Sequence, residues 1–210
     1  MDQIPLSPHD VIQRPGQNLR YVYFPLRGVI SLMTAMQDGT AVETATVGNE
    51  GMIGVHALLG GGAIGNLQAI GQVPGETLRM GADHFRAEVD AEDGKLREVL
   101  FAYMQALFVQ ISQGVACNGV HPIQQRCARW LLESHERAGS DEVHLTQEFL
   151  SDMLGVRRSS VTVAARTLQA AGLIEYGRGQ ITVIDRAGLE EASCECYSVI
   201  KQEYRRLVTR

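Results

Sequence analysis

One short segment in the C-terminal part of this chain carries several arginines and almost no acid. Residues 156 to 182 contain four arginines and a single acid, although the whole chain carries a net charge of −5. The excess acid lies elsewhere, because residues 1 to 92 hold five Lys and Arg against ten Asp and Glu. Clustered guanidinium groups neutralise phosphates, and a single one can offer two donors to a guanine edge. The segment therefore predicts binding to double-stranded DNA.

The pattern around these arginines predicts a helix-turn-helix followed by a wing. Thr146 can cap a first helix, and Gly155 can supply the tight turn after it. A second helix is expected from Arg158 to Ala171, ended by Gly172, and two short apolar strands then flank a glycine-rich tip at 176–179. The helical period places one set of side chains toward the core: Val161, Ala165 and Leu168. It leaves an opposite set free to contact a ligand: Ser159, Thr162, Val163 and Arg166.

The stretch from 145 to 183 resembles the winged helix-turn-helix of the Crp/Fnr family of bacterial transcription regulators. The resemblance rests on the ordered motifs L-T-Q-E, L-G-V, R-x-S-V and A-G-L-I. The chain has Arg157, Ser159 and Val163 where the family usually has Ser, Glu and often Arg, so its operator need not match the best known one. The resemblance and the helical pattern together imply these DNA-contacting residues: Thr146, Gln147, Arg158, Ser159, Ser160, Thr162, Val163, Arg166 and Arg178. The alternative is a winged helix that binds another protein.

The N-terminal part predicts short antiparallel strands. Runs at 21–24 and 29–36, a turn at 37–39 and a run at 40–47 indicate a hairpin, and 82–89 indicates a short helix. With the motifs D-V-I-Q-R-P-G-Q and V-G-N-E-G-M-I-G, this order resembles the cyclic-nucleotide-binding β-roll of the same family. The matching stretch Gly51 to Gln72 contains no charged residue and no Ser or Thr to hold a phosphate. We therefore expect no cyclic-AMP binding, an unknown effector, and a hairpin tip rather than a phosphate loop at Gly60 to Gly62.

The cysteines and histidines predict no cofactor and no metal. No cysteine precedes Cys117, which excludes the N-terminal iron–sulfur site of the family's oxygen sensors. His56 or His84 could ligate a haem, although a surface or hydrogen-bonded role is the simpler interpretation. Cys194 and Cys196 fall in a helical pattern from 188 to 208, where residues two apart point away from each other. On that basis they share neither a metal nor a disulfide, and Cys196 is a small buried hydrophobe, with a redox role as the alternative.

A long helix is expected between the two regions, from Lys95 to about Val115. An apolar seam at alternating three- and four-residue spacing indicates pairing with a second copy of the chain: Phe101, Met104, Phe108, Ile111 and Val115. An adjacent apolar strip can cover the β-roll: Leu96, Leu100, Tyr103 and Leu107. The alternative is a helix buried within one chain. Gly114 and Asn118–Gly119 are expected to loosen the helix, and a new one is expected to begin at His121–Pro122.

These features predict an α+β protein with three parts: a β-roll sensor at 1–92, a dimerisation helix at 93–119 and a winged helix-turn-helix domain with a C-terminal helix at 120–210. As a member of the family it would be a homodimeric regulator, acting on an inverted-repeat operator and contacting RNA polymerase if it activates. We expect a cytoplasmic protein with no membrane span and no enzymatic activity, since no catalytic constellation is recognisable.

Overall fold

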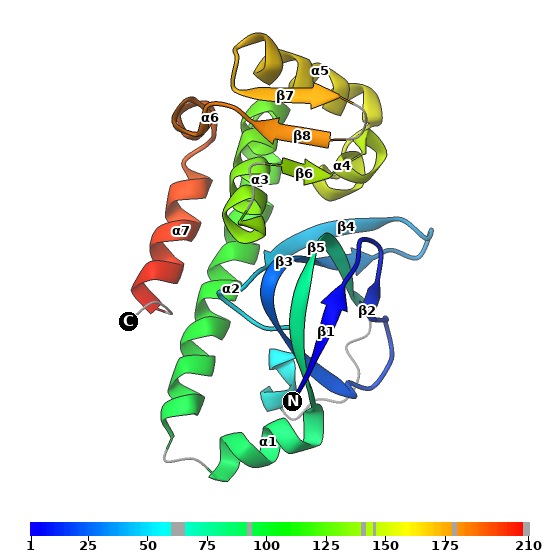
Figure 1. Cartoon of the computed structure of the whole chain (residues 1–210), viewed down its shortest axis with the longest axis vertical. Helices are drawn as coiled ribbons and strands as arrows, with labels where there is room; N and C mark the ends of the chain where they lie inside the picture. Colours follow the sequence, from blue (N-terminus) through cyan, green and yellow to red (C-terminus); the bar gives the residue numbers. More distant parts are fainter. Residues whose placement is uncertain (60–65, 92–93, 140–141, 145, 178–179, 208–210) are drawn as a thin grey trace.

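The computed structural model describes residues 1–59, 66–91, 94–139, 142–144, 146–177 and 180–207. An N-terminal β-roll packs beside a long helix, and a smaller C-terminal domain sits on one end of both (Figure 1). The last helix returns along the long one, so the two ends of the chain lie on opposite sides of it. The predicted α+β class is confirmed.

The β-roll is a five-stranded antiparallel sheet. Its strands are β1 (Asp2–Leu6), β2 (Val11–Gln13), β3 (Tyr21–Ala35), β4 (Ala41–Val47) and β5 (Leu67–Gly81), in the order β1-β5-β3-β4 with β2 also paired to β5. A 3-10 helix, η1 (Val55–Leu59), follows β4, and α1 (Ala82–Ala91) follows β5. The predicted hairpin of β3 and β4 and the short helix at α1 are confirmed. The expected tip at Gly60 to Gly62 lies outside the described residues.

One strand of the roll is longer than expected. The runs at 21–24 and 29–36 form the single strand β3, because the register shifts around Gly28 instead of the strand ending there. Gly28 has φ +88, and a Cβ at this position would lie 2.6 Å from the carbonyl oxygen of Val73 on β5. A glycine therefore lets the two strands stay paired through the irregularity.

The long helix α2 spans Lys95–Val120. The expectation that it ends near Val115 is wrong, since it continues through Gly114, Asn118 and Gly119. Each of these residues disfavours a helix by about 1 kcal/mol or less. Packing outweighs that cost, because α2 contacts the last helix of the chain and buries Cys117 completely.

By length and composition alone α2 could cross a membrane, but the core helix of a soluble protein can meet the same criterion. In this structure the middle of the helix carries a buried polar residue that is hydrogen-bonded within the protein. Gln110 is buried, its Nε2 donates to the Thr46 carbonyl of β4 at 3.1 Å, and its Oε1 accepts from the Tyr204 hydroxyl at 2.8 Å. These hydrogen bonds tie the middle of α2 to the roll and to the last helix.

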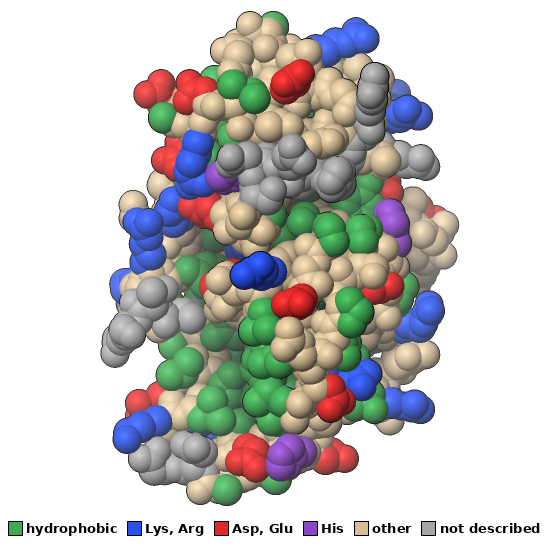
Figure 2. Space-filling view, viewed as in Figure 1, with side chains coloured by type: hydrophobic (Ala, Val, Ile, Leu, Met, Phe, Trp, Pro, Cys, Tyr) green, Lys and Arg blue, Asp and Glu red, His purple; other side chains and the backbone are tan. Residues whose placement is uncertain are grey.

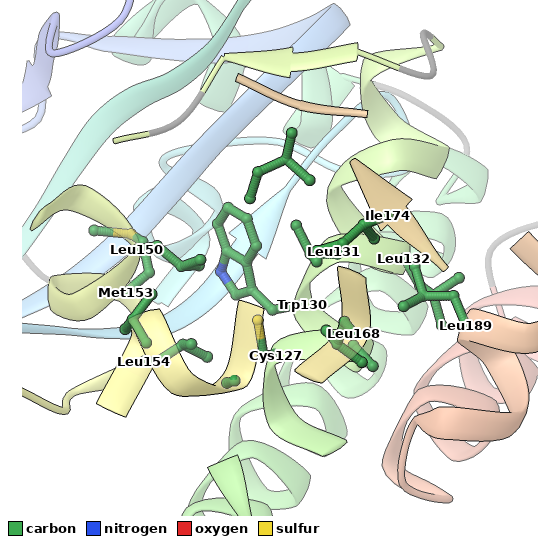
Figure 3. Close-up of a cluster of buried hydrophobic side chains, with 14 of the residues drawn as sticks. Cys127, Trp130, Leu131, Leu132, Leu150, Met153, Leu154, Leu168, Ile174 and Leu189 are labelled. Carbon is green, nitrogen blue, oxygen red and sulfur yellow. The ribbon is translucent and has the colours of Figure 1, made fainter. Parts of the chain in front are cut away.

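The C-terminal domain contains three helices and a small sheet. The helices are α3 (Ile123–Ala138), α4 (Gln147–Leu154) and α5 (Arg158–Ala170), and the sheet has the order β6-β8-β7 from β6 (Glu142–His144), β7 (Ile174–Gly177) and β8 (Gln180–Val183). Their core surrounds Trp130, Leu150 and Leu168 (Figure 3). Val29 and Met33 of β3 join the same core, so the domain packs directly on the β-roll.

The C-terminal region is two helices, not the single one expected from 188 to 208. Helix α6 (Arg186–Ala192) is capped by the Asp185 carboxylate, which accepts from the Gly188 amide at 2.9 Å. Ser193 is extended, and α7 (Cys196–Leu207) then starts in a new direction. Cys194 therefore lies between the helices, which changes how it is placed relative to Cys196.

Candidate nucleic-acid interface

The first helix of the helix-turn-helix is fixed at both ends. The Thr146 hydroxyl accepts a hydrogen bond from the Phe149 amide at 3.1 Å, as predicted for a helix cap. Leu150, Met153 and Leu154 are buried in the domain core. Gly155 has φ +61 and turns the chain sharply toward α5.

Helix α5 has one buried face and one exposed face, as the helical period predicted. The buried face comprises Val161, Ala164, Ala165 and Leu168. On the other side the predicted contact residues reach the surface: Arg158, Ser159, Val163 and Arg166 are exposed, and Ser160 and Thr162 are partly exposed. Val163 is 57% exposed, which is unusual for a valine and leaves both methyl groups available for contact.

Gln147 links the starts of the two helices. Its side-chain oxygen accepts from the Thr162 hydroxyl at 3.1 Å and from the Arg158 Nε at 3.4 Å. Arg157 occupies the N-cap of α5, where no side-chain cap is found among the described residues. The hydrogen bonds of Gln147 therefore hold the Arg158 guanidinium and the first turn of α5 in place.

The wing is present, with a third strand that the sequence did not reveal. Strands β7 and β8 form the predicted hairpin, and Gln169 of α5 accepts from the Tyr176 amide at 3.2 Å. The additional strand β6 pairs with β8 but has only three residues, two of them polar, which is too short for a periodic signal. Arg178 at the predicted tip lies outside the described residues.

A polar cluster joins the β-roll to the C-terminal domain. Glu43 of β4 accepts from the Ser31 hydroxyl at 2.6 Å and from the Trp130 indole nitrogen of α3 at 2.8 Å. As a residue Glu43 is partly exposed, but its carboxyl group points between the two domains. Loss of solvation there raises the pKa of Glu43 to about 7, against the lowering effect of its two hydrogen bonds.

The V-G-N-E-G motif has a structural role at this junction. Glu50 accepts from Arg137 of α3 at 2.7 Å, and Arg137 also contacts Glu133 at 3.5 Å. A Cβ at Gly48 would lie 2.6 Å from Cγ of Arg137, and one at Gly51 would lie 2.3 Å from the Tyr103 ring. The two glycines therefore allow the segment after β4 to approach both α3 and α2 closely.

A mainly apolar cavity of about 510 Å³ lies between the roll and α2. Hydrophobic side chains also reach the surface between the long helix and the sheet (Figure 2). Among the described residues that line the cavity none is charged, and the polar ones are Gln13, Thr44, His56 and Gln105. His56 therefore faces the candidate effector cavity, and burial lowers its pKa. His84 lies on α1, where it is exposed and contacts Glu88 at 3.6 Å.

The predicted dimerisation seam divides into two sets. Phe101, Phe108 and Val115 are 51%, 71% and 68% exposed. Met104 and Ile111 are instead partly buried against the β-roll. The strip expected to cover the roll does so, since Leu100 and Tyr103 are buried and Leu96 and Leu107 pack beside the same clusters. The first set is therefore the more exposed of the two.

A group of potential metal ligands has no signature in the sequence pattern, and the expectation that two of them point apart is wrong. Cys194 and Cys196 do not point apart on one helix, because Cys194 precedes α7. Together with Cys117 of α2 and its C-cap residue His121, they place four ligand atoms within 4.8 Å of one another. The sequence pattern places His121 at the start of the next helix, whereas it caps the end of α2, and its amide donates to the Cys117 carbonyl one turn earlier.

Comparison with known proteins agrees with the two-domain arrangement. The family model "Cyclic nucleotide-binding domain" matches residues 3–92, and "Crp-like helix-turn-helix domain" matches residues 125–192. The two models together match well over half of the chain. It belongs to the Crp/Fnr family. The protein is therefore a DNA-binding transcription regulator.

Solved structures of Crp/Fnr regulators share the fold of most of the chain. FixK2 from Bradyrhizobium japonicum has a TM-score of 0.75 at 19% identity and covers 92% of this chain and 97% of its own. TTHB099, a transcriptional regulator of the CRP family from Thermus thermophilus, has a TM-score of 0.73 at 18% identity and covers 92% and 96%. TTHA1359 from the same organism has a TM-score of 0.70 at 23% identity and covers 91% and 98%. No curated protein matches the sequence.

Proposed function

We propose that this Crp/Fnr regulator binds an inverted-repeat operator as a homodimer, with α5 in the major groove. The observation that carries the proposal is the exposed face of α5, where arginine, hydroxyl and methyl groups stand on a helix whose other face is core. Arg158 can donate twice to a guanine edge, Ser159 and Thr162 can each donate once, and Val163 suits a thymine methyl. Arg166 and Arg178 are assigned to phosphates, and Thr146 and Gln147 to the backbone near the start of α4.

The homodimer rests on the exposed apolar side of α2. Phe101, Phe108 and Val115 are spaced by seven residues, so they lie along one stripe of the helix. Such a stripe is stabilised when the same stripe of a second chain covers it, which would place the two copies of α5 symmetrically. A dimer with twofold symmetry reads half-sites one helical turn apart.

We propose that the cavity between the roll and α2 is the effector site. Its lining is hydrophobic apart from a few neutral polar groups, which favours an uncharged ligand over a nucleotide phosphate. A ligand there would contact the roll and Phe108 of the dimer stripe together, which gives it a route to alter the dimer. The regulator would act in the cytoplasm, without enzymatic activity, and would contact RNA polymerase if it activates.

The salt dependence of DNA affinity tests this function against a winged helix that binds protein. DNA binding should weaken steeply with salt, because each neutralised phosphate releases counterions. Arg158→Ala should cost about 1 to 3 kcal/mol and relax preference at one base pair per half-site, whereas Arg178→Ala should weaken all sequences alike. The proposal would be contradicted if the protein did not bind duplex DNA at low salt, or if both substitutions left its affinity for DNA unchanged.

A further inference from the structure

Four potential metal ligands meet where the long helix ends. Cys117 lies in the last turn of α2 and His121 is its C-cap residue, while Cys194 precedes α7 and Cys196 is the first residue of α7. The three cysteines are 0%, 4% and 0% exposed and form a small buried cluster of their own. The fourth cysteine of the chain, Cys127, lies apart from them in the core of the DNA-binding domain.

The four ligand atoms all lie within 4.8 Å of one another, and two of their distances match those around a single tetrahedral metal ion. Zinc bonds of about 2.3 Å to sulfur and about 2.0 Å to nitrogen place tetrahedral ligand atoms roughly 3.5 to 3.8 Å apart. Cys117 Sγ and Cys194 Sγ are 3.5 Å apart, and Cys196 Sγ and His121 Nδ1 are also 3.5 Å apart. The ligand atoms of an iron–sulfur cluster bind different irons, so they lie farther apart than the ligand atoms of a single ion.

The neighbouring polar groups are arranged as they are around protein-bound metals. Glu195 Oε2 lies 3.2 Å from His121 Nε2, so a proton held on Nε2 leaves Nδ1 free to face the sulfurs. Gln113 Nε2 donates to Cys196 Sγ at 3.2 Å, which stabilises a thiolate. A carboxylate behind a ligating histidine orients the ring and strengthens its bond to the metal.

We propose that Cys117, His121, Cys194 and Cys196 bind one zinc ion. Binding would convert three thiols to thiolates, release their protons to solvent and leave the complex with one negative charge. Four protein ligands leave no open position, so the ion would be structural and not catalytic. It would fasten the end of the dimerisation helix to the junction of α6 and α7, beside the DNA-binding domain.

Zinc titration of the reduced, metal-free, full-length protein tests the site. We expect one Zn²⁺ per chain, and Co²⁺ in its place should show the thiolate charge-transfer bands of a tetrahedral site. Cys196→Ser and His121→Ala should each lower the affinity at least 100-fold, whereas Cys127→Ala should not change it. Glu195→Gln, a substitution at an exposed side chain, should lower the affinity about 10- to 100-fold without affecting the fold.

Several results would overturn the site. They are a reduced wild-type chain that takes up no Zn²⁺, a ligand variant that binds it as tightly as the wild type, and an iron–sulfur absorption spectrum after purification. A Cys117–Cys194 disulfide that forms as readily in zinc-saturated as in metal-free protein would indicate a redox pair instead. These measurements involve no DNA, so their failure would leave the proposed operator binding untouched.

Discussion

Replacing Phe108 by alanine should weaken the dimer by a factor of about 30 to 1000. The side chain is 71% exposed in a single chain, and complete burial of a phenylalanine stabilises by about 1.5 to 3 kcal/mol. Covering the exposed share would contribute about 1 to 2 kcal/mol per chain, and the twofold contact counts it twice. A loss of about 2 to 4 kcal/mol corresponds to that range in the dissociation constant.

Sedimentation equilibrium over a wide concentration range measures this change directly. Ile184→Ala is a matched control, because Ile184 is 59% exposed but lies after β8, away from α2. The control should dimerise like the wild type. If Phe108→Ala and the double variant with Val115→Asp sediment as the wild-type dimer does, the exposed stripe of α2 is not the dimer interface.

Three further predictions concern the roll and its contacts. The pKa of Glu43 is raised in the folded protein to about 7, so the folded protein binds this proton more tightly than the unfolded chain does. The free energy of unfolding should therefore fall as the pH rises from about 4.5 to 7. Chemical denaturation of the wild type should show that the free energy of unfolding falls by about 2 to 3 kcal/mol over this pH range, and Glu43→Gln should remove this fall. An equal dependence on pH in both proteins would exclude this carboxyl as the cause. Gly51→Ala should lower the melting temperature, because the new Cβ would lie 2.3 Å from the Tyr103 ring. Gly119→Ala, within α2 and with no atom within 4 Å of the new Cβ, should raise the melting temperature. Equal shifts of the melting temperature in the two variants would refute the packing argument. Calorimetry should detect no micromolar binding of cyclic AMP, since the stretch from Gly51 to Gln72 offers no charged or hydroxyl side chain for its phosphate, and cyclic-AMP-dependent DNA binding would contradict this.

Features that depend on neighbouring residues could be predicted from the sequence. The cap at Thr146, the turn at Gly155 and the two faces of α5 all follow from spacings of a few residues. The same holds for α1 and for the hairpin of β3 and β4. These elements include most of the proposed DNA-contacting surface, because that surface lies on one short helix.

Features that depend on distant partners could not be predicted. Strand β3 continues past Gly28 because β5, more than forty residues later, stays paired with it. The end of α2 is set by its packing against α7. The cluster of Cys117 with Cys194 joins residues 77 positions apart, and a small error about where α7 begins hides it. Helical periodicity alone cannot reveal such contacts.

Selection of binding sites from random duplexes tests the central claim most directly. The wild-type protein should enrich an inverted repeat whose half-site centres lie about 34 Å apart, one turn of the double helix. Arg158→Ala should enrich the same repeat with one base pair per half-site relaxed. The reading of DNA by two symmetric copies of α5 would be contradicted if the wild type enriched no sequence or a single asymmetric site. It would also be contradicted if Arg158→Ala enriched an unchanged repeat.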